Sequence, residues 1–212
     1  MQTFAGADRR AVGQRALFGY EAPAPDASFA AVERIHLDHG AWVDLARGWL
    51  VGHASLFEWL LAHTQWQGDE RLMYQRRVVV PRLRGQPPDH AASAAALAAM
   101  RAALDRRYET TFIRTGLALY RDGDDGVAWH GDAVARQMEE ALAATVSLGA
   151  PRKFLLRPTG GGASVALSLG WGDLLVMGGS CQRCYQHAIP KVARAAARIV
   201  VMFRPRWIAG LG

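Results

Sequence analysis

His130, Asp132 and His187 are the residue types that a non-haem iron site requires. Two imidazoles and one carboxylate occupy one face of Fe(II) and leave the opposite positions open for a co-substrate and O2. His130 and Asp132 are two positions apart, so on a strand both side chains leave the same face. His187 follows 57 positions after His130, which leaves enough chain for several intervening strands. These three residues are therefore the candidate metal ligands.

A second His-x-Asp pair, His36 and Asp38, is the rival for that role. It would need a partner imidazole with matching geometry, and His53 is the only near candidate. We therefore interpret the group around His36, Asp38 and His39 as a surface or turn cluster.

The segment from Arg198 to Arg204 adds two cationic side chains to the candidate site. Its composition, rich in Val, Ile and Phe, predicts a strand. The two arginines are six positions apart, an even number, so they should face the same side of that strand. Two guanidinium groups that point inward are costly unless an anion meets them. A dicarboxylate co-substrate would supply that anion.

The block from Leu117 to Pro205 resembles the AlkB group of Fe(II)/2-oxoglutarate dioxygenases. The resemblance is carried, in the order and spacing of the family, by Leu119-Tyr120-Arg121-Asp122-Gly123, Trp129-His130-Gly131-Asp132, Ser147-Leu148-Gly149, Gly172-Asp173, His187 and the Arg198/Arg204 segment. It implies that His130, Asp132 and His187 bind Fe(II). It also implies that Arg198, Arg204 and Tyr120 hold 2-oxoglutarate.

The sequence departs from the family pattern at positions beside these residues. Ala118 stands where the family usually has Asn, and Val200 and Met202 replace the Asn and Thr of the final strand. Ala133 and Val134 follow Asp132, where many members carry acidic residues. These differences bear on co-substrate affinity and on the identity of the substrate.

The resemblance implies oxidative dealkylation of N-alkylated bases in nucleic acid, as in alkylation damage repair or RNA demethylation, with Fe(II), 2-oxoglutarate and O2. A base inside a duplex cannot reach such a pocket, so the substrate would be single-stranded or have a flipped base. Two alternatives remain open. The chain could be a 2-oxoglutarate-dependent oxygenase of a protein or small molecule, or a catalytically inactive binding homologue.

Positive charge is concentrated between residues 71 and 84, where five arginines alternate with aromatic and apolar residues. Such a segment suits a nucleic-acid strand, because arginines contact phosphates and aromatic faces stack on bases. The resemblance implies a nucleotide-recognition lid here, and the alternative is an edge strand protected by charge. The candidate substrate contacts are Arg76, Arg77, Arg82, Tyr74 and Trp129.

Short strand-like runs joined by Gly-rich turns predict a double-sheet jelly roll after residue 111. The resemblance implies the double-stranded β-helix form of this fold. Two helices, at 56–66 behind a Ser55/Glu58 capping box and at 89–108 with Asp89 as N-cap, should pack outside it. We expect an α+β, mainly β fold in one domain over 1–212. Residues 1–110 would form an N-terminal extension that contains the lid, and residues 111–208 the catalytic core.

Composition sets the remaining expectations. The net charge of +6 favours an anionic or polyanionic partner. No apolar run is long enough to span a membrane, and two cysteines suit a reducing cytoplasm, so we expect a cytoplasmic protein without a membrane partner. We also expect a monomer. Cys181 and Cys184 are interpreted first as ordinary thiols near the pocket, then as a redox pair, and last as half of a zinc site.

Overall fold

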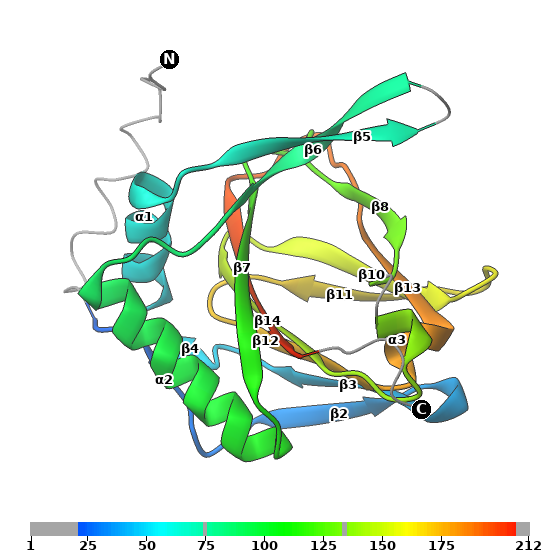
Figure 1. Cartoon of the computed structure of the whole chain (residues 1–212), viewed down its shortest axis with the longest axis horizontal. Helices are drawn as coiled ribbons and strands as arrows, with labels where there is room; N and C mark the ends of the chain where they lie inside the picture. Colours follow the sequence, from blue (N-terminus) through cyan, green and yellow to red (C-terminus); the bar gives the residue numbers. More distant parts are fainter. Residues whose placement is uncertain (1–20, 74–75, 133–134, 207–212) are drawn as a thin grey trace.

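A computed structural model describes residues 21–73, 76–132 and 135–206 (Figure 1). Its larger antiparallel sheet has the strand order β2 (Val32–His36), β3 (Ala41–Ala46), β12 (Leu174–Gly179), β9 (Ala143–Gly149), β14 (Arg198–Pro205), β7 (Phe112–Tyr120), β6 (Arg76–Gly85), β5 (Gln67–Met73). The smaller antiparallel sheet has the order β11 (Val165–Leu169), β10 (Arg152–Pro158), β13 (Tyr185–Ile189), β8 (Val127–His130). A short pair joins β1 (Ala24–Pro25) to β4 (Leu50–Val51).

The two sheets pack face to face, as the jelly-roll prediction required. Apolar side chains of β7, β9, β12 and β14 on the larger sheet meet Phe154 and Leu156 of β10 and Tyr185 of β13 in one buried cluster. The mainly β fold and the double-stranded β-helix architecture are therefore confirmed.

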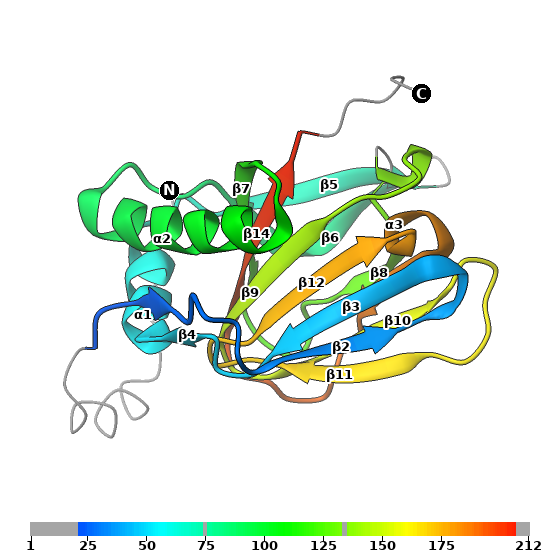
Figure 2. The same ribbon diagram turned by 90° about the horizontal axis from the view of Figure 1, so that it is seen from below.

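Helices α1 (His53–His63) and α2 (Ala91–Tyr108) cover the outer face of the larger sheet (Figures 1 and 2). The predicted caps are wrong at both helices. Helix α1 follows Gly52, which adopts a left-handed φ of 61°, so Ser55 lies inside the first turn and no side chain caps the helix. Helix α2 begins at Ala91, two residues after Asp89. None of the helices in the described part of the chain is long and apolar enough to cross a membrane.

Strand β14 lies between β9 and β7 and is buried on both faces. Its odd-numbered residues, Ile199, Val201 and Phe203, pack toward the helices. Its even-numbered residues face the space between the sheets, where Arg198 and Arg204 both line a cavity. The prediction that the two arginines share one side of a strand is therefore confirmed. They share it because side chains alternate along a strand with a period of two residues.

The turn between β7 and β8 brings β8 close to β13 and β6. A Cβ on Gly126 would lie 2.8 Å from the carbonyl oxygen of Ile189, so a larger residue could not occupy this position without a shift of the backbone. The N–H of Gly126 donates to the carbonyl of Pro81, with an N–O distance of 2.7 Å. This glycine therefore allows three strands to meet at the edge of the cavity.

The rival His-x-Asp pair lies where β2 meets a turn, since His36 ends β2 and Asp38 begins the turn. Asp38, His39 and Gly40 form the single 3-10 turn η1 between β2 and β3, and His39 has a φ of 62°. The N–H of Asp38 donates to the hydroxyl of Tyr185, and the hydroxyl of Ser180 donates to the carbonyl of His39. The turn interpretation of this cluster is confirmed.

Candidate active site

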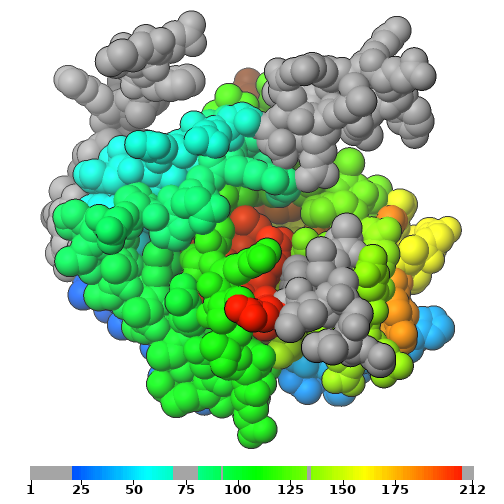
Figure 3. Space-filling view, viewed as in Figure 1, coloured from blue at the N-terminus to red at the C-terminus, as the bar shows by residue number. Residues whose placement is uncertain are grey.

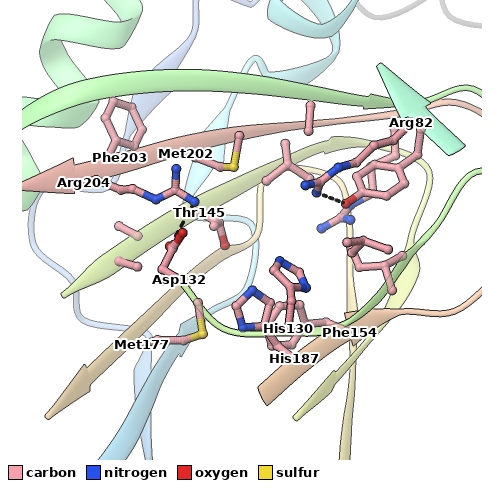
Figure 4. Close-up of a pocket in the computed structure, with 18 residues that line it drawn as sticks. Arg82, His130, Asp132, Thr145, Phe154, Met177, His187, Met202, Phe203 and Arg204 are labelled. Atoms are coloured by element: carbon pink, nitrogen blue, oxygen red, sulfur yellow. Dashed lines mark hydrogen bonds and ion pairs between the residues drawn. The ribbon is translucent and has the colours of Figure 1, made fainter. Parts of the chain in front are cut away.

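A cavity between the two sheets gathers the predicted metal and co-substrate residues (Figure 4). His130 ends β8 and Asp132 follows it, while His187 lies on β13 and Tyr120 ends β7. Arg198 and Arg204 come from β14. All six line the same cavity. Figure 3 shows the molecule hollowed beside the red atoms of β14, with the green atoms of β7 along one side.

The two imidazoles lie side by side because β8 and β13 pair with His130 opposite His187. Their ring centroids are 4.3 Å apart. His130 Nδ1 lies 2.9 Å from the carbonyl oxygen of Ala128, so Nδ1 donates to that carbonyl and Nε2 is the nitrogen that can bind a metal. Metal-binding histidines commonly have this arrangement. Phe154 stacks on the His187 ring and limits its rotation.

Burial lowers the pKa of His187 to about 3, and the positive charges of His130, Arg204 and Arg82 add to this effect. The ring is therefore neutral at pH 7. A neutral imidazole is the form that binds a metal, because the protonated ring has no lone pair to offer.

The Asp132 carboxylate faces Arg204 and forms an ion pair with it, with 3.0 Å between Oδ2 and Nη2 (Figure 4). The backbone N–H of Asp132 donates to Oε1 of the buried Gln182 side chain, which belongs to the short helix α3 (Cys181–Cys184). Within the described ranges, no three His, Cys, Asp or Glu side chains are grouped to hold a metal ion. The three predicted ligands thus share a cavity, but the carboxylate is paired with Arg204.

Arg198 is buried and has no carboxylate partner among the described residues. Its Nη2 donates to the hydroxyl of Ser147 at 2.7 Å, while Nε and Nη1 have no hydrogen-bond partner. Its Cζ lies 5.6 Å from the centroid of the Tyr120 ring. Burial lowers the pKa of Arg198 to about 10, which still leaves the guanidinium charged at pH 7. An unpaired buried charge of this kind is the mark of an anion-binding position.

Arg82 also lines this cavity. It comes from β6, and its Nη1 donates to the Tyr120 hydroxyl with an N–O distance of 3.1 Å. Its Nε is buried without a hydrogen-bond partner. The structure therefore brings Arg82, a predicted substrate contact, next to the predicted co-substrate residues.

Of the other predicted substrate contacts, Trp129 is the one whose side chain the structure describes, and it lies outside the cavity lining. The Arg157 guanidinium lies over the Trp129 ring, 4.0 Å from its centroid. Arg76 and Arg77 are the first two residues of β6, and the structure describes their backbone but not their side chains. Tyr74 lies outside the described residues.

Three of the departures from the family pattern, Ala118, Val200 and Met202, lie at the cavity, while Ala133 and Val134 lie outside the described residues. Ala118 and Val200 are cross-strand partners on β7 and β14, and both line it together with Met202. These residues make one wall of the cavity apolar.

Sequence reasoning missed the roles of three polar residues that support the site. Gln182 holds the backbone of Asp132, and Ser147 accepts a hydrogen bond from Arg198. Arg152 is buried and donates to the carbonyls of Asp122, Asp125 and Pro190, which joins the β7–β8 turn to the end of β13. The role of Ser147 could have been predicted. It lies two positions from Thr145 on an otherwise apolar strand, so both polar side chains leave the same face of that strand.

Cys181 and Cys184 begin and end helix α3, beside the segment that carries Asp132, and both are free thiols. Cys181 is buried in the core between the sheets, and burial raises its pKa to about 12. The thiol of Cys181 is therefore protonated and unreactive at neutral pH.

The fold and this cavity define a class of protein, and a comparison with known families identifies it. Residues 53–204 match the model of the 2OG-Fe(II) oxygenase superfamily, and the chain belongs to that family. The family is named for its use of Fe(II) and 2-oxoglutarate, and the cavity described above contains residues of the types that such a site requires.

Within that superfamily the chain is AlkB-like. It is 28% identical over 137 residues to alpha-ketoglutarate-dependent dioxygenase alkB homolog 3 of Mus musculus. The aligned region covers 60% of this chain and 45% of that relative. The rat protein of the same name is 28% identical over 146 residues, with 65% and 47% covered. The chain thus spans about half the length of the curated relatives it matches.

Solved structures support the fold. OsALKBH1 matches with a TM-score of 0.51 and 12% identity, over 82% of this chain and 100% of that one. A prolyl hydroxylase from Trichoplax adhaerens, solved with a hypoxia inducible factor peptide, matches with a TM-score of 0.53 and 11% identity, over 72% and 74%. A 2OG-Fe(II) oxygenase family protein from Burkholderia pseudomallei matches with a TM-score of 0.51 and 15% identity, over 74% and 79%.

Proposed function

We propose that this chain oxidatively removes alkyl groups from the nitrogen atoms of nucleic-acid bases. It would act as a monomer on single strands or on a base flipped out of a duplex. The observation that carries this proposal is a cavity in which two adjacent imidazoles and a carboxylate share the lining with the buried guanidinium of Arg198.

The proposed metal ligands are His130, Asp132 and His187. The Nδ1 hydrogen bond of His130 leaves Nε2 as the nitrogen that would bind the metal, and the low pKa of His187 keeps that imidazole neutral, as a metal ligand must be. Asp132 would complete the set when its carboxylate leaves Arg204. Bound Fe(II) would supply the oxidising chemistry, using O2 and the oxidative decarboxylation of 2-oxoglutarate.

The proposed co-substrate contacts are Arg198, Arg204 and Tyr120. Arg198 offers two buried nitrogen atoms without partners, which a carboxylate of 2-oxoglutarate would satisfy. Arg204 would bind the other end of the dianion when Asp132 turns to the metal. Phe154, Met177 and Ile189 line the same cavity and would exclude water from it.

The nucleic-acid part of the proposal rests on charge, position and similarity. The chain carries a net charge of +6, and the β5–β6 hairpin extends past the edge of the barrel above β8 in Figure 1. Its sequence holds Arg71, Arg76 and Arg77, and curated relatives are AlkB homologues. We propose that this hairpin, within the N-terminal 110 residues, is the nucleotide-recognition lid and that the core follows it.

Turnover on a panel of N-methylated DNA and RNA oligonucleotides tests this function. The proposal predicts formaldehyde release from methylated strands, none from matched unmethylated strands, and none without 2-oxoglutarate. The variant His187→Gln should release none, while His36→Gln should release as much as the wild type.

Succinate production without formaldehyde from any methylated oligonucleotide would overturn the nucleic-acid proposal. It would favour an oxygenase that acts on a protein or a small molecule. The absence of both products would indicate an inactive binding homologue.

A further inference from the structure

We propose that Arg82 is a positioning residue for the co-substrate, acting through the Tyr120 hydroxyl, and that it is not a contact to nucleic acid. This inference rests on the proposed function, because it takes Tyr120 as a co-substrate contact. Of the two arginines in residues 71–84 whose side chains the structure describes, Arg82 and Arg84, it is Arg82 that lines the cavity, and the proposal gives it a new role.

The direction of the hydrogen bond between these two residues limits what Tyr120 can do. A guanidinium has only donors, so the Tyr120 oxygen must accept from Arg82 Nη1. The hydroxyl hydrogen of Tyr120 is then directed to another acceptor. The Tyr120 side chain is buried, and its charged neighbours across the ring, Arg198 and Arg152, are donors as well. A carboxylate bound in the cavity is the acceptor that fits this environment.

The charge of the cavity supports the same conclusion. Among the described residues that line it, Arg82, Arg198 and Arg204 carry three positive charges, against the single carboxylate of Asp132. Nitrogen atoms of both Arg82 and Arg198 are buried without partners. A buried guanidinium without an anion is costly, so an anionic ligand in this cavity would offset the cost for both residues.

The position of Arg82 in β6 gives the proposal a second consequence. The described pairing of β6 with β7 covers only Leu83, Arg84 and Gly85, so Arg82 lies where the β5–β6 hairpin leaves β7. The carbonyl of Pro81 accepts from Gly126, and Arg82 reaches Tyr120. A co-substrate that holds Tyr120 would therefore also stabilise the base of the hairpin.

Arg84 provides a matched control on the same strand. It is exposed and lines a separate groove with Gln65, Gln67 and Pro87, away from the cavity that contains Arg82. Replacing Arg84 removes one positive charge from β6 without changing the surroundings of Tyr120.

The test is the affinity for 2-oxoglutarate, measured by calorimetry with Mn(II) in place of Fe(II) so that no turnover occurs. Arg82→Met and Tyr120→Phe should each weaken binding by about tenfold, the effect of one charge-assisted hydrogen bond. The double variant should be no weaker than either single variant, because both remove the same interaction. Arg82→Lys should restore part of the affinity, and Arg84→Met should bind like the wild type.

Hydrogen exchange provides a readout that does not depend on activity. Adding 2-oxoglutarate with Mn(II) should protect the amides of residues 82–85 in the wild type and in Arg84→Met. That protection should be lost in Arg82→Met. Affinity for a methylated oligonucleotide should be unchanged by Arg82→Met when 2-oxoglutarate is saturating.

Arg198→Met separates failure of this inference from failure of the proposed function. If Arg198→Met abolishes 2-oxoglutarate binding while Arg82→Met retains full affinity for it, the role of Arg82 is refuted and the co-substrate site stands. Weaker oligonucleotide binding by Arg82→Met at saturating 2-oxoglutarate would also refute the proposal, because it would show that Arg82 contacts nucleic acid. If Arg198→Met and Tyr120→Phe both bind normally, the proposed co-substrate site itself is wrong.

Discussion

Asp132 and Arg204, a proposed metal ligand and a proposed co-substrate contact, form an ion pair with 3.0 Å between Oδ2 and Nη2. In this pair Arg204 supplies the positive charge that a metal ion would bring to Asp132, and Asp132 supplies the negative charge that 2-oxoglutarate would bring to Arg204. Binding of the metal and of 2-oxoglutarate should therefore be coupled. Each ligand releases the side chain that the other one needs.

Removing Arg204 should strengthen metal binding when 2-oxoglutarate is absent. The variant Arg204→Met frees the Asp132 carboxylate, and the ion pair is partly exposed, so the gain should be small, about two- to fivefold in Mn(II) affinity. The same variant should weaken 2-oxoglutarate binding. Calorimetric titration with each ligand separately measures both effects. Equal or weaker Mn(II) binding by the variant would refute the competition.

Replacing Arg198 should stabilise the protein in the absence of ligands. The variant Arg198→Met removes a buried charge that has two unpartnered nitrogen atoms, which should raise the free energy of unfolding by about 1–3 kcal/mol. It should also abolish the stabilisation that 2-oxoglutarate gives the wild type. Urea unfolding with and without 2-oxoglutarate tests this. A less stable variant would mean that the charge already has a compensating partner.

Arg152 should respond in the opposite way, although it is also a buried arginine in the same half of the core. Its guanidinium satisfies the carbonyls of Asp122, Asp125 and Pro190. The variant Arg152→Met leaves these acceptors without their donor and should lower the free energy of unfolding by about 2–4 kcal/mol. Comparison with Arg198→Met under identical conditions provides the control. Equal effects of the two substitutions would show that burial alone decides the outcome.

Cys181 should make the stability fall at alkaline pH. Burial raises its pKa to about 12, above the ordinary thiol value of 9.0, so the unfolded chain loses this proton first. The stabilisation is complete below pH 9 and is lost as the pH rises from 9 to 12. Between pH 9 and 10 the wild type should lose about 1 kcal/mol more than Cys181→Ala. Urea unfolding at both values measures this, and parallel losses would contradict the expected burial.

The strand period and the motif spacing were sufficient to predict most of the site. The even spacing of Arg198 and Arg204 predicted that both would face one cavity, and His130 and His187, predicted on separate strands, lie on neighbouring ones. The helix caps were wrong because Ser55 is a favourable cap only if the helix begins after it, and the preceding turn at Gly52 starts the helix earlier.

Other features depend on tertiary contacts that no local pattern encodes. The direction of Trp129 follows from the pairing of β8, which turns His130 inward and leaves the indole under Arg157. Arg82 reaches Tyr120 only because β6 joins the sheet beside β7. The pairing of Asp132 with Arg204 likewise needs the loop after β8 to approach β14.

The stoichiometry of anaerobic Fe(II) binding tests the central claim most directly. We predict one ion per wild-type chain, no measurable binding in His130→Gln, Asp132→Ala or His187→Gln, and normal binding in His36→Gln, which changes the rival pair. Retention of one tightly bound ion by His187→Gln, or its loss in His36→Gln, would contradict the assignment of the metal site.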